Sequence, residues 1–404
     1  MSETLLVAQL GAPTAVINQT LVGVVEEARQ AGVGRVLGSR NGVLGLLHDE
    51  IFDLSAEPAE VLAAVRTTPG AVLGSCRYNL RRQGGAEDFA RIAETLARRR
   101  VTGLIFIGGN GTMAALREVA RVSKAHGREV RVVGAPKTID NDMFGTDHTP
   151  GYGSVAKYVA TTAQEAGRDT ESLATFDTCT VIETMGRDSG WIAAAAGLAH
   201  VCEDDAPHIV LAPELPVTWK RLGEQVHRTV KRVGRCVVVA GEGLRDADGN
   251  FLAPQTVDPS GQMQFGGVAE VLRDFIQGDL GYKCRYNKPG TAQRNAAHLA
   301  SACDACEADA VGREAARALA AGETMKMVSI RRRGDRPYAV EFDLVDLDEA
   351  AGRQRVLPRE FLDEEGTAIS DAFRRYLEPL VQGRVEVAET SGGLPQCVRL
   401  TQRV

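Results

Sequence analysis

The sequence has no uninterrupted apolar stretch of membrane-spanning length, and its first residues lack both the basic start and the long apolar core of a signal peptide. It also has no excess of positive charge. The formal net charge of −6 argues against a protein that binds nucleic acid through its overall electrostatics. No segment is of low complexity, and no short internal repeat is found. We therefore expect a cytoplasmic protein with no nucleic-acid or membrane partner.

Paired cysteines are nearly absent as well. The eight cysteines are scattered, which is typical of reduced thiols. Cys303 and Cys306 form the only CxxC pair, and it lies in an alanine-rich segment of helical character. Because no second pair and no suitably spaced histidines accompany it, we expect two cysteines on a helix face rather than a zinc site.

What the sequence does contain is an ordinary globular composition with many glycines. Apolar residues make up 44% and charged residues 25%, and 404 residues suffice for two or three domains. The 43 glycines exceed the usual share of about 7%. Many of them directly follow apolar runs, a placement that indicates loops approaching a ligand closely.

Near-continuous apolar runs alternate with helical patterns in the first third of the chain. The expected strands cover residues 5–8, 36–37, 71–73, 104–107 and 130–134, and helical spacing of apolar residues covers 17–28 and 86–100. This alternation indicates a parallel sheet covered by helices on both faces. In such sheets ligands bind at the carboxyl ends of the strands.

The middle third repeats this pattern and indicates a second α/β lobe, with strands expected at 180–183, 208–211 and 237–240. Two lobes facing each other across a cleft would each supply loops to one ligand. From about residue 322 the pattern changes. Alternating runs at 327–330 and 338–342 predict antiparallel strands, followed by a helical tail.

The segment from Pro136 to Asp142 carries the most chemistry. It follows the apolar run at 130–134 and places a lysine, a threonine and two aspartates within a few residues. Burying such a mixture is costly without polar partners. A lysine attracts phosphate, and a carboxylate can take a proton from an alcohol or hold a divalent cation. The segment favours a site where a phosphoryl group meets a hydroxyl nucleophile. The alternative is a polar turn after a strand.

Residues 109–114 fit the loose form GxGxxA of dinucleotide-binding loops. That interpretation needs an acidic residue about 20 residues further on, where this chain has Lys137. A hydride-transferring enzyme is therefore disfavoured. A glycine loop at a helix N-terminus still suits phosphate, because free backbone N–H groups point outward. The alternative is a tight strand-to-helix turn with no ligand.

Six loops, taken in chain order, resemble those of the phosphofructokinase family, and the resemblance spans nearly the whole chain. They cover residues 11–18, 74–78, 136–142, 185–187, Glu242 and 293–294. The first loop has the form typical of the family's pyrophosphate-using branch. The resemblance implies an α/β fold of two doubly wound parallel-sheet lobes that face a central cleft, with a C-terminal extension.

The same resemblance implies a division of labour between the lobes. Residues 1–140 with roughly 265–322 would form the phosphoryl-donor-binding lobe, and residues 141–264 with roughly 323–404 the sugar-phosphate-binding lobe. The implied reaction transfers a phosphoryl group to the 1-hydroxyl of fructose 6-phosphate. It gives fructose 1,6-bisphosphate in a reversible step of glycolysis.

Roles for individual residues follow from the resemblance. Asp140 would be the general base, and Asp142 with Asn110 would hold Mg²⁺. The remaining residues fall into three groups: Arg77, Lys137 and Thr138 at the transferred group; Gly11, Gly109, Asn110, Gly111 and Thr112 at the donor phosphate; and Met185, Gly186, Arg187, Glu242, Arg285 and Arg294 at the sugar phosphate.

Two family markers of the phosphoryl donor disagree. The residue between Pro136 and Thr138 is glycine in members that use ATP and lysine in members that use pyrophosphate, and here it is Lys137. Within the glycine loop, pyrophosphate users often carry Asp where this chain has Gly111, the residue of ATP users. Lys137 adds both charge and volume, so we expect pyrophosphate, with ATP as the alternative donor.

Two further departures concern the metal and the acceptor. Asn110 stands where the family usually has an acid, so it can offer an oxygen to Mg²⁺ but no charge. Thr178 stands where a basic residue often reaches the sugar phosphate of a neighbouring subunit. Sedoheptulose 7-phosphate therefore stays open as an acceptor. We expect a homodimer or a homotetramer, because neighbouring subunits complete the sugar site in the family.

A catalytically inactive sugar-phosphate sensor of the same fold is a competing function. The presence of Asp140, Asp142 and Arg77 argues against it. His148 follows the catalytic loop and could act as an acid or base. Because Asp140 is available as the base, we expect a structural role for His148.

Overall fold

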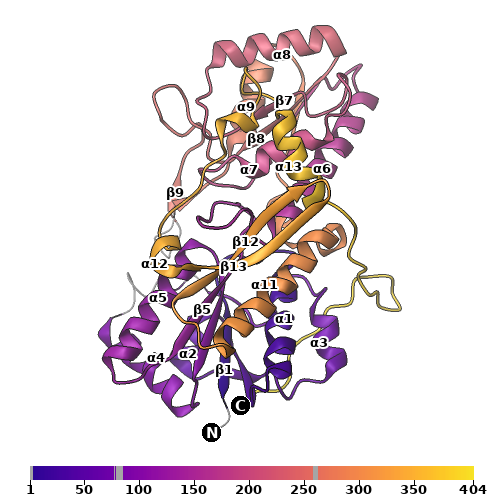
Figure 1. Cartoon of the computed structure of the whole chain (residues 1–404). Helices are drawn as coiled ribbons and strands as arrows, with labels where there is room; N and C mark the ends of the chain where they lie inside the picture. Colours follow the sequence, from indigo (N-terminus) through magenta and orange to yellow (C-terminus); the bar gives the residue numbers. More distant parts are fainter. Residues whose placement is uncertain (1–2, 77, 79–84, 258–262) are drawn as a thin grey trace.

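The computed structural model describes residues 3–76, 78, 85–257 and 263–404, which form two α/β lobes, one above the other in Figure 1. Each lobe is built around one sheet, as the sequence predicts. Within these residues, none of the helices is both long enough and apolar enough to cross a membrane. Cys303 and Cys306 lie in one helix, also as predicted.

The first lobe contains a seven-stranded sheet with five parallel strands in its middle and an antiparallel strand at each edge. Its order is β13 (Tyr338–Asp346), β12 (Lys326–Asp335), β5 (Arg131–Pro136), β4 (Gly103–Gly108), β1 (Thr4–Gln9), β2 (Arg35–Ser39) and β3 (Ile51–Asp53). Every residue of β1 and β4 is buried, because helices cover both faces of the sheet.

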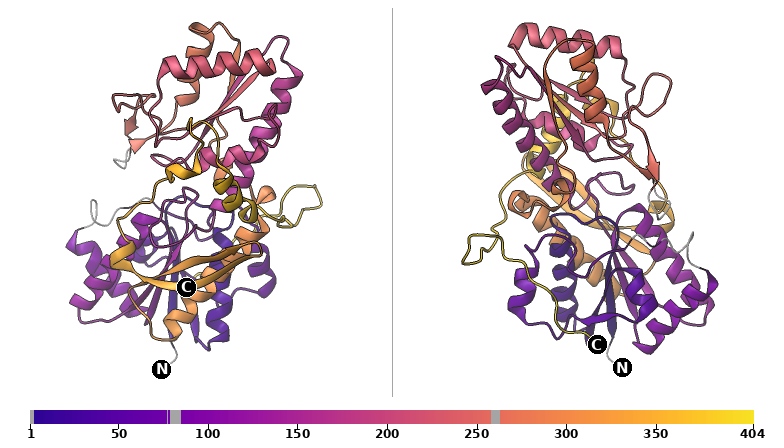
Figure 2. Two further views of the ribbon diagram at one scale, coloured as in Figure 1. Left: turned by 45° about the horizontal axis from the view of Figure 1, so that its top comes forward. Right: turned by 180° about the vertical axis from the view of Figure 1, so that it is seen from behind.

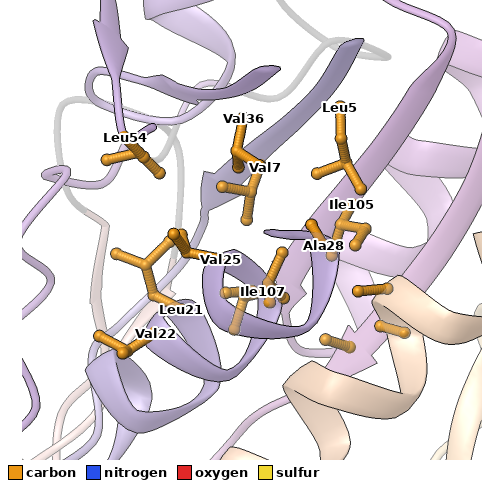
Figure 3. Close-up of a cluster of buried hydrophobic side chains, with 14 of the residues drawn as sticks. Leu5, Val7, Leu21, Val22, Val25, Ala28, Val36, Leu54, Ile105 and Ile107 are labelled. Carbon is orange, nitrogen blue, oxygen red and sulfur yellow. The ribbon is translucent and has the colours of Figure 1, made fainter. Parts of the chain in front are cut away.

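Helices cover this sheet in two layers. One face carries α1 (Ile17–Gln30), α3 (Ala59–Val65) and α11 (Ala302–Ala320), and the other α2 (Val43–His48), α4 (Ala86–Arg98), α5 (Asn110–Ala125) and α12 (Leu347–Ala350). Figure 3 shows the first of these cores, where Leu21 and Val25 of α1 lie near Val7 of β1. Glycines let α1 and α11 approach closely, since a Cβ on Gly312 would lie 2.1 Å from the Thr20 carbonyl oxygen.

The second lobe contains a four-stranded parallel sheet in the order β11 (Cys284–Asn287), β6 (Cys179–Thr184), β8 (Cys236–Gly241) and β7 (Ile209–Leu211). One face packs against α6 (Tyr152–Ser172), α7 (Trp191–Ala195), the short helix η1 (Ala196–Ala199) and α13 (Asp371–Leu380), and the other against α8 (Trp219–Val233) and α9 (Val268–Gly278). The smaller elements are β9 (Thr256–Val257), β10 (Met263–Gln264), α10 (Ala292–Asn295), η2 (Ala297–Leu299) and η3 (Arg359–Phe361).

The chain crosses between the lobes more often than the sequence predicts. Residues 265–322 were expected in the first lobe, but α9 and β11 belong to the second, and only α11 returns to the first. Residues 323–404 were expected in the second lobe, but β12 pairs with β5 of the first sheet. The buried apolar side chains of β12 explain this placement, because they complete the first lobe's cores. The last part of the chain then runs back from the second lobe to the edge of the first (Figure 2).

Residues 71–73 do not form the expected strand. The reason is that side chains, not a neighbouring strand, take up their backbone N–H groups. The N–H of Val72 donates to Asn18 Oδ1 at 3.1 Å, and that of Leu73 to Gln9 Oε1 at 3.0 Å. Asn18 Nδ2 also donates to the Thr68 carbonyl oxygen at 2.7 Å. This buried amide cluster holds the segment that leads to Ser75 against the first strand and helix.

Candidate active site

Most of the expected site residues lie in loops that follow five parallel strands: β1, β4 and β5 in the first sheet, and β6 and β8 in the second. They therefore lie at the carboxyl ends of both sheets. The two sets of loops meet at Asp140, whose carbonyl oxygen accepts a hydrogen bond from Ser189 Oγ at 3.4 Å. This arrangement agrees with the sequence prediction, in which strand-end loops from two lobes form one site.

Hydrogen bonds to the loop after β1 hold the Lys137 side chain in place. Its side chain is 3% exposed, and its Nζ donates to the carbonyl oxygens of Leu10 at 3.1 Å and Ala12 at 2.6 Å. Burial lowers the pKa of this ammonium to about 8, against the opposing attraction of Asp140. Gly11 has φ +75°, and a Cβ there would lie 3.6 Å from Nζ, so the backbone passes directly beside the lysine.

Thr138 and Asp140 form a small hydrogen-bonded turn. The Asp140 N–H donates to Thr138 Oγ1 at 3.2 Å, and that hydroxyl donates to Asp140 Oδ2 at 3.3 Å. Burial raises the pKa of the Asp140 carboxyl, while nearby Arg187, the Thr138 hydroxyl, Lys137 and Arg294 oppose the rise. A buried carboxylate whose proton affinity is raised suits a general base.

Asp142 and Asn110 lie side by side. Asn110 Nδ2 donates to Asp142 Oδ2 at 3.1 Å, and Gln354 Nε2 donates to the same oxygen at 3.1 Å. Burial, together with the charge of Asp140, raises the pKa of Asp142 to about 6. Among the residues that the structure describes, the buried Asn110 Oδ1 has no hydrogen-bond partner.

These two side chains fit Mg²⁺ as the family implies it. Magnesium is commonly held by one or two carboxylates together with substrate phosphates, and prefers oxygen ligands. Asp142 offers a carboxylate, and Asn110 offers a buried amide oxygen that no other group uses within the described ranges. In the same part of the chain, no group of three or more His, Cys, Asp and Glu side chains is arranged to hold a metal ion. Substrate phosphate oxygens and water would therefore supply most of the ligands.

The glycine loop starts α5. Gly109 is the N-cap and Asn110 the first helical residue, so the free N–H groups of the helix lie next to Asp142. Thr112 is buried against Gly108, where a Cβ would lie 2.2 Å from its hydroxyl oxygen. By contrast, apart from its chain neighbours and the backbone of its own helix, no atom of the described residues lies within 4 Å of a Cβ built on Gly111. The loop thus leaves open space above the helix N-terminus.

The loops of the second lobe are tied together by side chains. The Met185 N–H donates to Gln293 Oε1 at 3.1 Å, and the Arg187 N–H donates to Glu242 Oε1 at 3.1 Å. Gly186 has φ +135° and Arg187 φ +54°, so this loop turns sharply. Burial raises the pKa of Glu242 to about 7, because its hydrogen bond from Arg187 compensates only in part.

A family model described as "Phosphofructokinase" matches residues 4–319. The chain belongs to the phosphofructokinase family. A pyrophosphate–fructose 6-phosphate 1-phosphotransferase from Xanthomonas campestris pv. campestris (strain B100) is 41% identical over 402 residues, covering 98% of this chain and 96% of that protein. A sulfofructose kinase from Alkalicoccus urumqiensis is 33% identical, covering 96% of this chain and 98% of that protein.

Solved structures agree with this membership. The crystal structure of a pyrophosphate-dependent phosphofructokinase from Nitrosospira multiformis superposes with a TM-score of 0.92 at 34% sequence identity, covering 100% of this chain and 98% of that one. The predicted phosphofructokinase-like fold is therefore confirmed. The chain is a phosphotransferase of this family.

Two expected site residues of the phosphofructokinase pattern stand apart from the others. Arg285 lies in β11 opposite Thr180, near the start of β6, and its side chain pairs with Asp177. Within this chain it thus lies beside the start of β6, whereas Met185 follows the end of that strand, and its role at the sugar phosphate stays a prediction. Arg77 lies outside the described residues. Just before it, Ser75 Oγ donates to the Gly11 carbonyl oxygen at 2.6 Å.

Sequence reasoning assigned no role to three residues that contact the phosphofructokinase site. Gln293 holds Met185, and its position beside Arg294 could have drawn attention to it. Gln354 and Arg355 reach the catalytic loop from the C-terminal extension. No local signal marks these two, because more than 200 residues separate them from their partners.

Proposed function

We propose that this chain transfers a phosphoryl group from pyrophosphate to the 1-hydroxyl of fructose 6-phosphate, giving fructose 1,6-bisphosphate reversibly as a step of glycolysis. The observation that carries the choice of donor is Lys137, a buried cation held by the Leu10 and Ala12 carbonyl oxygens at the end of β5. The names of relatives that match nearly the full chain support the same donor and acceptor.

In this proposal Asp140 takes the proton from the 1-hydroxyl while the hydroxyl oxygen attacks phosphorus. The phosphoanhydride bond breaks, and inorganic phosphate leaves. Lys137 and Arg77 stabilise the phosphate oxygens as charge shifts, and Thr138 orients the Asp140 carboxylate through their 3.3 Å hydrogen bond. Proton transfer to a positioned base of this kind typically contributes about 10²–10⁴-fold to the rate.

Asp142 and Asn110 would hold Mg²⁺, which when bound neutralises charge on the phosphate oxygens. Gly11, Gly109, Gly111 and Thr112 would line the donor phosphate, since the N-terminus of α5 suits an anion.

On the sugar side, Arg187 and Arg294 would bind the 6-phosphate and the ring. Glu242 would accept hydrogen bonds from sugar hydroxyls, and its bond from the Arg187 N–H holds it in place. Met185 and Gly186 would shape the pocket.

Two alternatives concern the donor and the acceptor, and the observations support them unequally. The open space at Gly111 would admit a bulkier donor such as ATP, but the relatives at 39–41% identity are named for pyrophosphate, so ATP is not favoured. For the acceptor, the 33% identical sulfofructose kinase and the neutral Thr178 favour testing related sugars, including sedoheptulose 7-phosphate. We further propose a cytoplasmic homodimer or homotetramer.

An aldolase-coupled assay tests the reaction. Purified protein with Mg²⁺, pyrophosphate and fructose 6-phosphate is expected to form fructose 1,6-bisphosphate, and faster than it phosphorylates sedoheptulose 7-phosphate. No bisphosphate product from fructose 6-phosphate would contradict the proposed function.

A further inference from the structure

The C-terminal extension contacts the catalytic loop through Gln354 and Arg355, and Arg355 makes most of the hydrogen bonds. Arg355 Nε and Nη2 both donate to the Asn141 carbonyl oxygen, at 3.2 and 3.1 Å. Its Nη1 donates to the carbonyl oxygens of Thr146, at 3.1 Å, and of Asp147. The Arg355 N–H donates to the Asp142 carbonyl oxygen at 2.8 Å. One residue therefore binds four backbone carbonyls between positions 141 and 147.

The conformation that Arg355 supports is an unusual one. Asn141 has φ +53°, in the left-handed region, and it lies between the two carboxylates Asp140 and Asp142. Its side chain is also fixed, since Asn141 Nδ2 donates to the Tyr376 hydroxyl at 3.2 Å and Oδ1 accepts from the Thr149 N–H at 3.1 Å. A left-handed residue persists where its surroundings hold it. The backbone conformation at Asn141 determines how the chain turns between the two aspartates.

Arg355 also connects the catalytic loop with the sugar-phosphate side. Its guanidinium lies 4.5 Å from the ring centroid of Trp191, which begins α7 just after the loop of residues 185–190. Two residues on, the Leu357 N–H donates to Glu214 Oε1 at 2.8 Å, and the same oxygen accepts from the Gly190 N–H at 2.9 Å. The extension thus contacts the catalytic loop directly, and it is linked to the loop of residues 185–190 through Trp191 and Glu214.

A planar guanidinium suits this task. It presents five N–H donors in a rigid fork, whereas a lysine ammonium is a point charge on a flexible stem. Removing Arg355 would leave the Asn141 carbonyl without both of its side-chain hydrogen bonds and would free the turn between Asp140 and Asp142.

We infer that Arg355 is a positioning residue for phosphoryl transfer: it holds the catalytic loop so that Asp140 and Asp142 point at the reacting groups, without touching substrate itself. The neighbouring Gln354 adds a hydrogen bond to the Asp142 carboxylate. The C-terminal extension is therefore part of the catalytic apparatus. The roles of the two aspartates, though not the contacts of Arg355, rest on the proposed function.

A matched control distinguishes positioning from plain stability. Arg374, in α13 of the same extension, also binds three backbone carbonyls, those of Gly197 at 3.2 Å, Leu198 at 3.1 Å and His200 at 2.6 Å. These partners lie in and after η1, and within the described ranges Arg374 donates no hydrogen bond to the catalytic loop. Both arginines are half-buried. Arg374→Ala should therefore lower thermal stability without changing the chemistry.

The test compares Arg355→Ala, Arg355→Lys and Arg374→Ala in the full chain with saturating Mg²⁺. We expect Arg355→Ala to lower kcat about 10²-fold, because small displacements of catalytic groups cost that much, with KM for both substrates within about threefold. Arg355→Lys should fall between wild type and alanine. Arg374→Ala should keep kcat within about twofold. Equal kcat for the two alanine variants, each corrected for folded protein, would overturn the inference. If Arg355→Ala does not fold, the kcat of Arg355→Lys is compared with that of Arg374→Ala, and equal values would again overturn the inference.

A second measurement does not depend on turnover. Hydrogen–deuterium exchange of a peptide spanning residues 138–149 reports local opening of the loop. Arg355→Ala, or Arg355→Lys in its place, should speed exchange in this peptide at least tenfold, and Arg374→Ala should leave it unchanged. Unchanged exchange in the Arg355 variants would overturn the inference. Wild-type protein that fails to turn over pyrophosphate and fructose 6-phosphate would instead overturn the proposed function, and the exchange result would still decide the role of Arg355.

Discussion

The Nζ atom of Lys137 lies 3.1 Å from the carbonyl oxygen of Leu10, so the loop after β5 is fastened to the loop after β1. The lysine therefore does two things at one place. Its side chain fills space beside the loop of residues 10–12, and its ammonium brings a positive charge to the carboxyl end of the first sheet. Both are reasons for a small, highly charged donor to fit better than a nucleotide.

Charge and volume at position 137 can be separated with two variants. Lys137→Gly removes both, and Lys137→Met removes the charge while keeping most of the volume. Both should lower kcat with pyrophosphate by about 10²–10³-fold, since each deletes one stabilising cation. Only Lys137→Gly should gain activity with ATP. Coupled assays with each donor check this, and a Lys137→Met variant with wild-type pyrophosphate turnover would remove the electrostatic role of the lysine.

Asp140→Asn tests the general base. An amide cannot accept the hydroxyl proton, so kcat should fall by about 10²–10⁴-fold. The fold of the loop should survive, because the Thr138 hydroxyl can still bond the Asp140 N–H and an amide oxygen. Isothermal titration should show fructose 6-phosphate affinity within about threefold of wild type. Turnover above about a tenth of wild type would exclude Asp140 as the base and leave the sensor hypothesis open.

Asp142→Asn tests the metal assignment. Replacing the one carboxylate beside Asn110 should raise the Mg²⁺ concentration for half-maximal activity about tenfold or more, because a charged oxygen ligand becomes neutral. Gln354→Ala is the control. It removes only a hydrogen bond to the same carboxylate and should shift the Mg²⁺ requirement much less. Equal Mg²⁺ dependence of Asp142→Asn and wild type would place the metal elsewhere.

We expect the free energy of unfolding to fall at alkaline pH because of His148. It is buried, with Nδ1 2.8 Å from Asp147 Oδ1 and Nε2 2.7 Å from Glu307 Oε2, and the two carboxylates raise its pKa to about 9 in spite of burial. A pKa raised above the unfolded value of about 6.5 gives stability that is fully present below that pH and is lost as pH rises through 9.

The loss amounts to roughly 3 kcal/mol, because the pKa of about 6.5 in the unfolded chain rises to about 9 in the folded protein. Urea unfolding between pH 6 and pH 9.5 measures it. His148→Gln should be less stable at pH 6 and should have a flatter profile over this range. Parallel profiles for the two proteins would show that the imidazolium does not contribute.

Much of the site could be predicted from sequence because it is local. A strand is a short apolar run, the loop follows it directly, and parallel strands bring their loops to one edge, so Gly109, Lys137 and Met185 were predicted together. Residues 71–73 also form an apolar run, but Gln9 and Asn18 take up the backbone N–H groups that a strand would need. Such competition depends on contacts distant in the sequence.

The same limit applies to the C-terminal extension. Gln354 and Arg355 contact residues 212 and 214 positions away in the chain. Their role depends on how the extension returns across both lobes, and no pattern around them indicates that path.

The most direct test of the central claim is the ratio of kcat/KM with pyrophosphate to that with ATP, measured on the same preparation at saturating fructose 6-phosphate and Mg²⁺. A pyrophosphate-dependent phosphotransferase with Lys137 in place should favour pyrophosphate by a factor of about 10² or more. A ratio near one, or one that favours ATP, would contradict the assignment of the donor.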